Sequence, residues 1–224
     1  MVQVISSDFI IHEGKVIYLC STKSNKIHEN NSFTITQSVY PSITSKEEST
    51  LVIIAQKIVD AFELPDGPLL IQSILHNNEF SVVEFSERIG GGSKYDLIEQ
   101  LTDFNIMEYY VNLNLGILTE IRISKKYEYA LMNYVYAKNG VIKEIKGLET
   151  LKQSSIIDKY YIYKKNDSVI TKHDTSSDRP FGFLLLSNSK DDINKRLEIC
   201  DNALAILDDS GVDIMMHSIN KGFV

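Results

Sequence analysis

Short runs of apolar and β-branched residues, separated by turn-forming residues, recur along the whole chain and predict β-strands. Hairpin turns are expected at Glu13-Gly14-Lys15, at His76-Asn77-Asn78-Glu79 and at Asn139-Gly140. A loop is expected at 23–32. The predicted strands lie at 2–12, 16–21, 33–40, 69–75, 80–85, 127–138, 141–145, 156–163, 168–172, 181–187 and 212–217.

Apolar residues at helical spacing separate these strands. Ser45 and Glu48 have the spacing of a capping box, and the apolar residues that follow them share one helical face as far as Phe62. Further helices are predicted at 97–104 and 106–115, and from Ser189 to Leu207. The mixture predicts an α+β protein in which a large antiparallel sheet with flanking helices is followed by a smaller β-rich α+β subdomain.

The pattern changes around residues 117–126, where we place the boundary between two domains, 1–117 and 118–224. The chain has 224 residues, of which 43% are hydrophobic and 24% charged, as is usual for a globular protein. Its net charge of −7 argues against a nucleic-acid partner, which requires a basic patch.

No apolar run reaches the roughly 18 residues that a transmembrane helix needs, so no membrane partner is expected. The N-terminus lacks the pattern of a signal peptide. Cys20 and Cys200 lie far apart and have no metal-binding spacing, which favours two reduced thiols in a cytoplasmic protein.

The segment 81–92 holds the most promising chemistry. Glu84, Ser86 and Arg88 are spaced two residues apart, so an extended backbone would point all three to one face and leave Val83 for burial on the other. Antiparallel pairing across the preceding turn can bring Gln72 to the same face. Amide and carboxylate oxygens suit Mg²⁺.

The residues that follow could complete a phosphate site. The Arg88 guanidinium can bind phosphate oxygens in pairs. Gly90, Gly91 and Gly92 would let the backbone approach a ligand closely. The plain alternative is a solvated ion pair followed by an ordinary glycine loop.

Other kinds of site find less support. The order of Ser93 and Lys94 after the glycines is the reverse of a P-loop, and the third glycine of a dinucleotide fingerprint is missing. The histidines lack metal-binding spacing, and no Gly-x-Ser-x-Gly elbow indicates a nucleophilic serine.

The combination of Gln72, Glu84-Phe-Ser-Glu-Arg88 and three glycines resembles the metal-binding signature of the ATP-grasp ligases, which include carbamoyl phosphate synthetase, biotin carboxylase and L-amino-acid ligases. The resemblance implies that Gln72 and Glu84 bind Mg²⁺. Ser86 stands where the family usually has asparagine, so its place as a third metal ligand is a departure from the pattern.

For the remaining residues, the resemblance implies that Arg88 contacts the reacting phosphate and the acyl-phosphate intermediate. It implies that Gly90, Gly91 and Gly92 line the pocket for cofactor and acceptor. The expected reaction is ATP-dependent joining of a carboxylate to an amine or other nitrogen, with ATP and Mg²⁺ as cofactors.

The resemblance covers nearly the whole chain but only the C-terminal part of the family fold. The N-terminal domain, the lid over the phosphates and the adenine-contacting hinge are expected elsewhere, in cis or in trans. The Mg–ATP site is therefore expected to be incomplete, with weak or absent ATP binding and no activity in this chain alone. An excised piece, a split-gene product and a degenerate remnant all fit.

Two rival interpretations stay open at this point. One is a non-catalytic interaction or assembly module derived from an ATP-grasp enzyme. The other is a plain α+β binding domain with a fortuitous motif, which would be favoured if Gln72 and Glu84 lay on opposite faces of their sheet.

Overall fold

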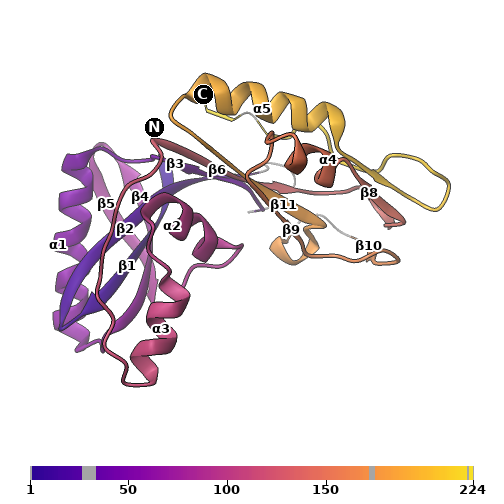
Figure 1. The fold of residues 1–224 in the computed structure, drawn as a ribbon. Coiled ribbons are helices and arrows are strands. Elements are labelled where there is room, and N and C mark those ends of the chain that lie inside the picture. The colour runs from indigo at the N-terminus through magenta and orange to yellow at the C-terminus, as the bar shows by residue number, and fades with distance from the viewer. Residues whose placement is uncertain (1, 27–33, 172–174, 221, 224) are drawn as a thin grey trace. The chain divides into compact units, whose positions relative to one another are not determined.

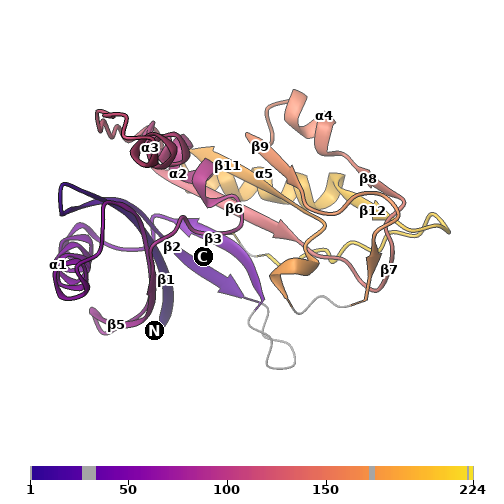
Figure 2. The same ribbon diagram turned by 90° about the horizontal axis from the view of Figure 1, so that it is seen from below.

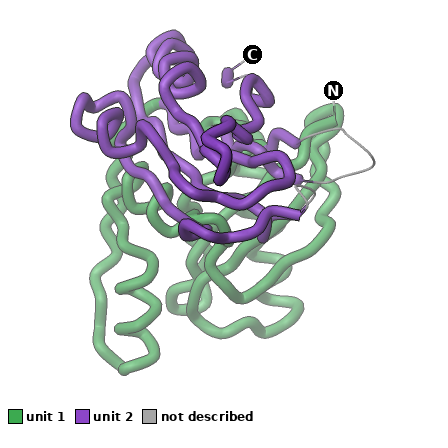
Figure 3. Tube along the Cα trace, turned by 90° about the vertical axis from the view of Figure 1, so that its right-hand side faces the viewer, with its two compact units in different colours: residues 1–23, 40–128 green, residues 24–39, 129–224 purple. Residues whose placement is uncertain are grey.

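The computed structural model describes residues 2–26, 34–171, 175–220 and 222–223. They form an α+β structure of antiparallel strands with flanking helices, as the sequence predicts (Figure 1). Packing divides the chain into two compact units, Met1–Lys23 with Tyr40–Glu128 and Ser24–Val39 with Tyr129–Val224 (Figure 3). Residues 118–128 therefore pack with the first unit, whereas the sequence analysis placed the boundary at residue 117.

The first unit is a four-stranded antiparallel sheet with helices on both faces. The strands, in spatial order, are β5 (Glu79–Ser86), β4 (Gly67–His76), β1 (Gln3–His12) and β2 (Lys15–Lys26). One face is covered by α1 (Ser45–Phe62), and α2 (Lys94–Thr102) and α3 (Ile106–Asn114) lie on the other side (Figures 1 and 2).

The helix α1 is held to the sheet by its apolar stripe. Leu51, Ala55 and Val59 recur every fourth residue, are buried, and pack against Phe9 and Ile71 of the strands. The predicted helix is confirmed, but the capping box lies one residue earlier than predicted.

The capping box uses Thr44 and Glu47. The Thr44 hydroxyl accepts from the Glu47 backbone N–H, and the Glu47 carboxylate accepts from the Thr44 N–H at 2.7 Å. Ser45 and Glu48 have the same spacing, so the pattern alone did not distinguish the two pairs. Only Thr44 has the extended backbone of an N-cap, with Ser45 already in the helix.

Both predicted hairpins of this unit are present. Their turns place two consecutive residues in the left-handed region, Glu13 and Gly14 at φ 51° and 71°, and Asn77 and Asn78 at φ 51° and 63°. Glycine and asparagine tolerate this geometry best, which explains why these turn sequences are good hairpin signals. The predicted loop at 23–32 is wrong for its first four residues, which continue β2, and the rest of it lies outside the described residues.

The second unit has its own antiparallel strands and core. Its larger sheet contains β3 (Ile35–Tyr40), β6 (Tyr129–Val135), β11 (Phe181–Ser187) and β9 (Lys159–Ile162), in that order. The helix α5 (Lys190–Ala203) packs on β6 and β11 through Ile193, Leu197 and Cys200. The smaller elements are β7 (Gly140–Val141), β8 (Glu144–Lys146), α4 (Leu148–Gln153), β10 (Val169–Ile170), a 3₁₀ helix (Ser176–Asp178) and β12 (Ala205–Leu207).

The strand pairing of the second unit corrects the sequence analysis. The segment 141–145 does not return along β6, because β7 pairs with β10 and β8 pairs with β12. The residues just after β6 instead meet the C-terminal segment, where the Lys138 N–H donates to the Ile214 carbonyl. The segment 212–217, predicted as a strand, makes only isolated bridges, and α4 was not predicted. These pairings join segments that are distant in sequence, so no hairpin pattern predicts them.

No helix in the part of the chain described here is long and apolar enough to cross a membrane.

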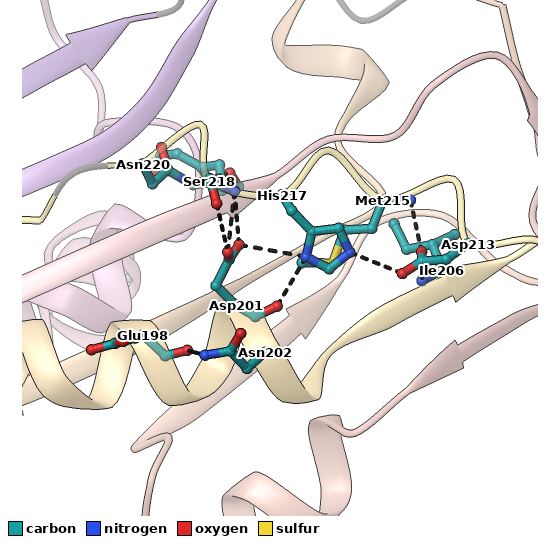
Figure 4. A network of polar contacts seen from close by, with 10 residues as sticks. Glu198, Asp201, Asn202, Ile206, Asp213, Met215, His217, Ser218 and Asn220 are labelled. Atoms are coloured by element: carbon teal, nitrogen blue, oxygen red, sulfur yellow. Dashed lines mark hydrogen bonds and ion pairs between the residues drawn. The ribbon is translucent and has the colours of Figure 1, made fainter.

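A polar network fastens the C-terminal segment to α5 (Figure 4). His217 contacts the Asp213 carboxylate through Nε2 and the Asp201 carbonyl through Nδ1, each at 2.9 Å. Ser218 donates to the Asp201 carboxylate from its backbone N–H and its hydroxyl. Both ring nitrogens of His217 therefore face oxygen acceptors, and only the protonated imidazolium can donate to both.

Burial lowers the pKa of His217, but its contacts with Asp213 and Asp201 outweigh this and raise the pKa above its usual value. The stabilisation from these His217 contacts is thus fully present below the pKa of an unfolded histidine, about 6.5. It is lost as the pH rises through the higher pKa of His217 in the folded protein.

We therefore expect His217→Asn to destabilise the protein by about 0.5–1 kcal/mol at pH 5.5, since the side chain is partly exposed, and by less at pH 9. Urea unfolding at both pH values measures the difference. His76→Asn, at an exposed position beside a hairpin turn, is the control. A His217→Asn effect of equal size at both pH values would contradict the ion-pair account.

Candidate functional site

The hairpin of β4 and β5 brings the two predicted metal ligands together. Gln72 and Glu84 are direct cross-strand partners, so their side chains leave the sheet on the same face. Ser86 is the partner of Leu70, one step further along this face. The predicted juxtaposition of Gln72 and Glu84 is confirmed. A fortuitous motif would have been favoured if the two residues lay on opposite faces of the sheet, and they do not.

A β-bulge sets this register. Ser73 pairs with Val82 and Gln72 pairs with Glu84, so Val83 is the extra residue of β5. Without the bulge, Val83 would stand opposite Gln72. Val83 was predicted to be buried, but this residue is 63% exposed. No feature of the sequence signalled the bulge.

Polar side chains continue from the hairpin across the sheet. Gln72 is also the partner of Ser6 in β1, and Ser6 is the partner of Thr22 in β2. A row of four polar residues, with Glu84 at its outer end, therefore crosses all four strands. The opposite face of the same strands carries Phe9, Ile11, Leu69 and Ile71, which pack against α1.

The loop after β5 carries the remaining predicted site residues. Arg88 is exposed, and its guanidinium donates to the neighbouring Ile89 carbonyl at 3.2 Å. Gly90 is half-buried, Gly91 is exposed, and Gly92 takes a left-handed conformation with φ 68° just before α2 begins.

A buried ion pair lies beneath this loop. Asp8 of β1 and Lys94 of α2 are 2% and 4% exposed, and the Lys94 Nζ lies 3.3 Å from the Asp8 Oδ2. Nζ also donates to the Thr22 hydroxyl at 2.5 Å. Burial raises the pKa of the Asp8 carboxyl above its usual value, and the charge of Lys94 opposes that rise.

This pair was not predicted from the sequence. One signal could have found it: Asp8 is a lone charge inside an apolar strand, and such a charge needs a partner when buried. Lys94 also stands in the first turn of a helix, where the helix dipole disfavours a cation.

The site offers oxygen ligands but no complete metal cage. Within the described residues, no group of three or more His, Cys, Asp or Glu side chains could hold a metal. Mg²⁺ commonly takes one or two protein ligands and completes its shell with water and phosphate oxygens. The donor set of Gln72, Glu84 and Ser86 fits that behaviour.

Comparison with solved structures shows the fold. A phosphoribosylglycinamide synthetase from Anaerococcus prevotii superposes with a TM-score of 0.80 at 15% identity, over 92% of this chain and 53% of its own. An L-amino acid ligase from Bacillus licheniformis gives 0.79 at 19%, over 92% and 52%. The chain has the ATP-grasp fold. A biotin carboxylase from Campylobacter jejuni, in complex with a β,γ-ATP, shares it at a TM-score of 0.71 and 13% identity, over 92% of this chain and 46% of its own.

Sequence comparison agrees with this fold. No family model matches the chain. The L-arginine-specific L-amino acid ligase of Bacillus subtilis is 24% identical over 196 residues, which are 82% of this chain and 45% of that protein. The chain therefore spans about half the length of the ATP-grasp proteins that it matches.

The buried ion pair leads to a stability prediction. Lys94→Met leaves the Asp8 carboxylate buried without its partner and should lower the free energy of unfolding by about 3–5 kcal/mol. The double variant Asp8→Asn with Lys94→Met removes both charges and should recover more than half of that loss. Urea unfolding followed by circular dichroism measures all of these variants.

The exposed pair between Lys126 and Asp103 provides the control, because Lys126→Met should cost less than about 1 kcal/mol. A double variant at the buried pair that is less stable than Lys94→Met would refute the pairing.

Proposed function

We propose that this chain is the C-terminal portion of an ATP-dependent carboxylate–amine or carboxylate–nitrogen ligase that acts through an acyl phosphate. The observation that carries the proposal is the direct pairing of Gln72 with Glu84 on the polar face of an ATP-grasp fold. The curated relative is an amino-acid ligase, which favours an amino acid or a similar small carboxylate as substrate.

In this proposal, Gln72 and Glu84 supply an amide and a carboxylate oxygen to Mg²⁺, and Ser86 contributes its hydroxyl directly or through water. Bound Mg²⁺ would neutralise charge on the β- and γ-phosphates of ATP. Ser86 is shorter than the asparagine usual at this position, so we expect the third contact to be the weakest of the three.

In this proposal, Arg88 binds the transferring phosphoryl group. Its guanidinium is exposed and donates a hydrogen bond to the adjacent Ile89 carbonyl. That bond is exchanged at little cost for two bonds to phosphate oxygens. Gly90, Gly91 and Gly92 then let the backbone approach the cofactor or acceptor closely.

The complete enzyme requires more than this chain supplies. About half of each matched protein lies outside the match, so we assign the adenine contacts and the lid to further segments, in cis or in trans. Cys20 and Cys200 are both buried and form no disulfide, which supports the proposed cytoplasmic location. ATP and a carboxylate substrate are the proposed small-molecule partners.

A second candidate is a non-catalytic assembly module. The serine at position 86, where the ATP-grasp signature usually has asparagine, favours it. The two candidates differ in whether the hairpin binds a divalent cation, because a module that has lost catalysis has no need of this site.

Metal binding tests the proposal. Mn²⁺ titration of this chain, followed by electron paramagnetic resonance, should show a site that Glu84→Gln weakens on the order of tenfold. Glu79→Gln, on the same strand beside the hairpin turn, is the matched control and should leave the affinity unchanged. Equal Mn²⁺ affinity in Glu84→Gln and wild type would reject the ligase assignment and favour the assembly module.

Calorimetric titration with Mg–ATP provides a separate check. We expect weak or no binding to this chain, because the segments assigned to adenine and to the lid lie outside the match. Micromolar affinity would contradict that assignment.

A further inference from the structure

Asp8 reaches the glycine run from the strand at the centre of the polar face. Its carboxylate accepts a hydrogen bond from the Gly90 backbone N–H, in addition to its ion pair with Lys94. The loop is thereby fastened to β1 through a main-chain contact. Asp8 and Lys94, two charged residues that are costly to bury, thus both lie beside Gly90.

The fit at Gly90 leaves no room for a side chain. A Cβ at this position would lie 2.9 Å from the Asp8 Oδ1 and 3.0 Å from the Lys94 Cγ. At Gly91, by contrast, a Cβ would meet nothing within 4 Å. Gly90 is therefore required by packing against the ion pair, whereas Gly91 is not.

The register connects this contact to the hairpin. Asp8 pairs with Leu70, and Leu70 pairs with Ser86, so the carboxylate stands on the polar face one step along from the row that contains Gln72. Arg88 lies between Ser86 and Gly90 in sequence, and its charge helps to lower the pKa of Asp8 against the larger effect of burial. The loop is consequently held on both sides of Arg88, by β5 before it and by Asp8 after it.

We propose that the buried pair of Asp8 and Lys94 is a positioning device that holds Gly90, and through it Arg88, at the hairpin's metal site so that Arg88 can bind phosphate. This inference rests on the proposed function. Asp8 and Lys94 touch no substrate in this account and act only through the loop.

A purely structural role for Asp8 and Lys94 would have a different effect on ligand binding. If Asp8 and Lys94 only stabilise the fold, disturbing Gly90 weakens every ligand of the unit alike. If they position Arg88, the disturbance weakens a polyphosphate and spares a bare cation, because Gln72 and Glu84 are held by the strands and not by the loop.

The experiment uses two probes on the whole chain, Mn²⁺ alone and Mg²⁺ with tripolyphosphate, the latter followed by phosphorus NMR up to tens of millimolar. Gly90→Ala should weaken tripolyphosphate about tenfold and change Mn²⁺ affinity less than about twofold. Gly91→Ala should change neither. Arg88→Met should match Gly90→Ala, and the double variant should lose no more than either single variant, because both act through one contact.

If Gly90→Ala does not fold, Thr22→Val provides a second way to disturb the Asp8–Lys94 pair. It removes the hydroxyl that accepts from Lys94 at nearly constant shape, and it should weaken tripolyphosphate about threefold with Mn²⁺ affinity unchanged.

Each of these results would overturn the inference: equal losses for both probes, no loss in Gly90→Ala and Thr22→Val, or no tripolyphosphate binding by the wild type. Additive losses in the double variant with Arg88→Met would overturn it as well. None of these depends on the Glu84→Gln result with Mn²⁺, so failure of the positioning device and failure of the metal site are told apart.

Discussion

The register of one β-hairpin determines the chemistry that this chain can offer. Because of the bulge at Val83, Glu84 stands opposite Gln72. A regular ladder would place a valine there and turn the carboxylate to the apolar side. The strands β1 and β2 extend the polar face, and α1 buries the other, so the hairpin cannot shift by one residue without exposing core side chains. The metal site in our account is thus fixed by the packing of the whole sheet.

The loop after the hairpin has a different kind of constraint. Backbone geometry alone leaves a run of three glycines nearly free, and the arginine two residues before it would sample many positions. The buried carboxylate of Asp8 removes much of that freedom by holding Gly90, while Lys94 balances its charge. Burying two charges costs stability that an apolar pair would not, and a role in placing Arg88 gives a reason to keep them.

Local signals carried most of the sequence-based prediction. The two hairpin turns of the first unit and the stripe of α1 follow from short-range rules of spacing and turn chemistry. The hairpin indicated that Gln72 and Glu84 could share a face, but the bulge that makes them direct partners was not predicted. The predictions were wrong where strand pairing depends on segments that are distant in sequence. The strands β7 and β8 pair with β10 and β12, and the residues after β6 meet the C-terminal segment. The pair of Asp8 and Lys94 was missed for the same reason, since only the folded sheet brings them together. The cap at Thr44 was misplaced by one residue because two neighbouring sequences satisfy the same rule.

The chain matches only about half the length of known ATP-grasp proteins, so turnover is expected to require further segments. The most direct test is therefore metal binding at the hairpin. That test is a crystal structure of this chain grown with Mn²⁺, with data collected at the manganese absorption edge. The account predicts an anomalous peak within coordination distance of both the Gln72 amide oxygen and the Glu84 carboxylate. Saturating Mn²⁺ with no peak between these two side chains would contradict it.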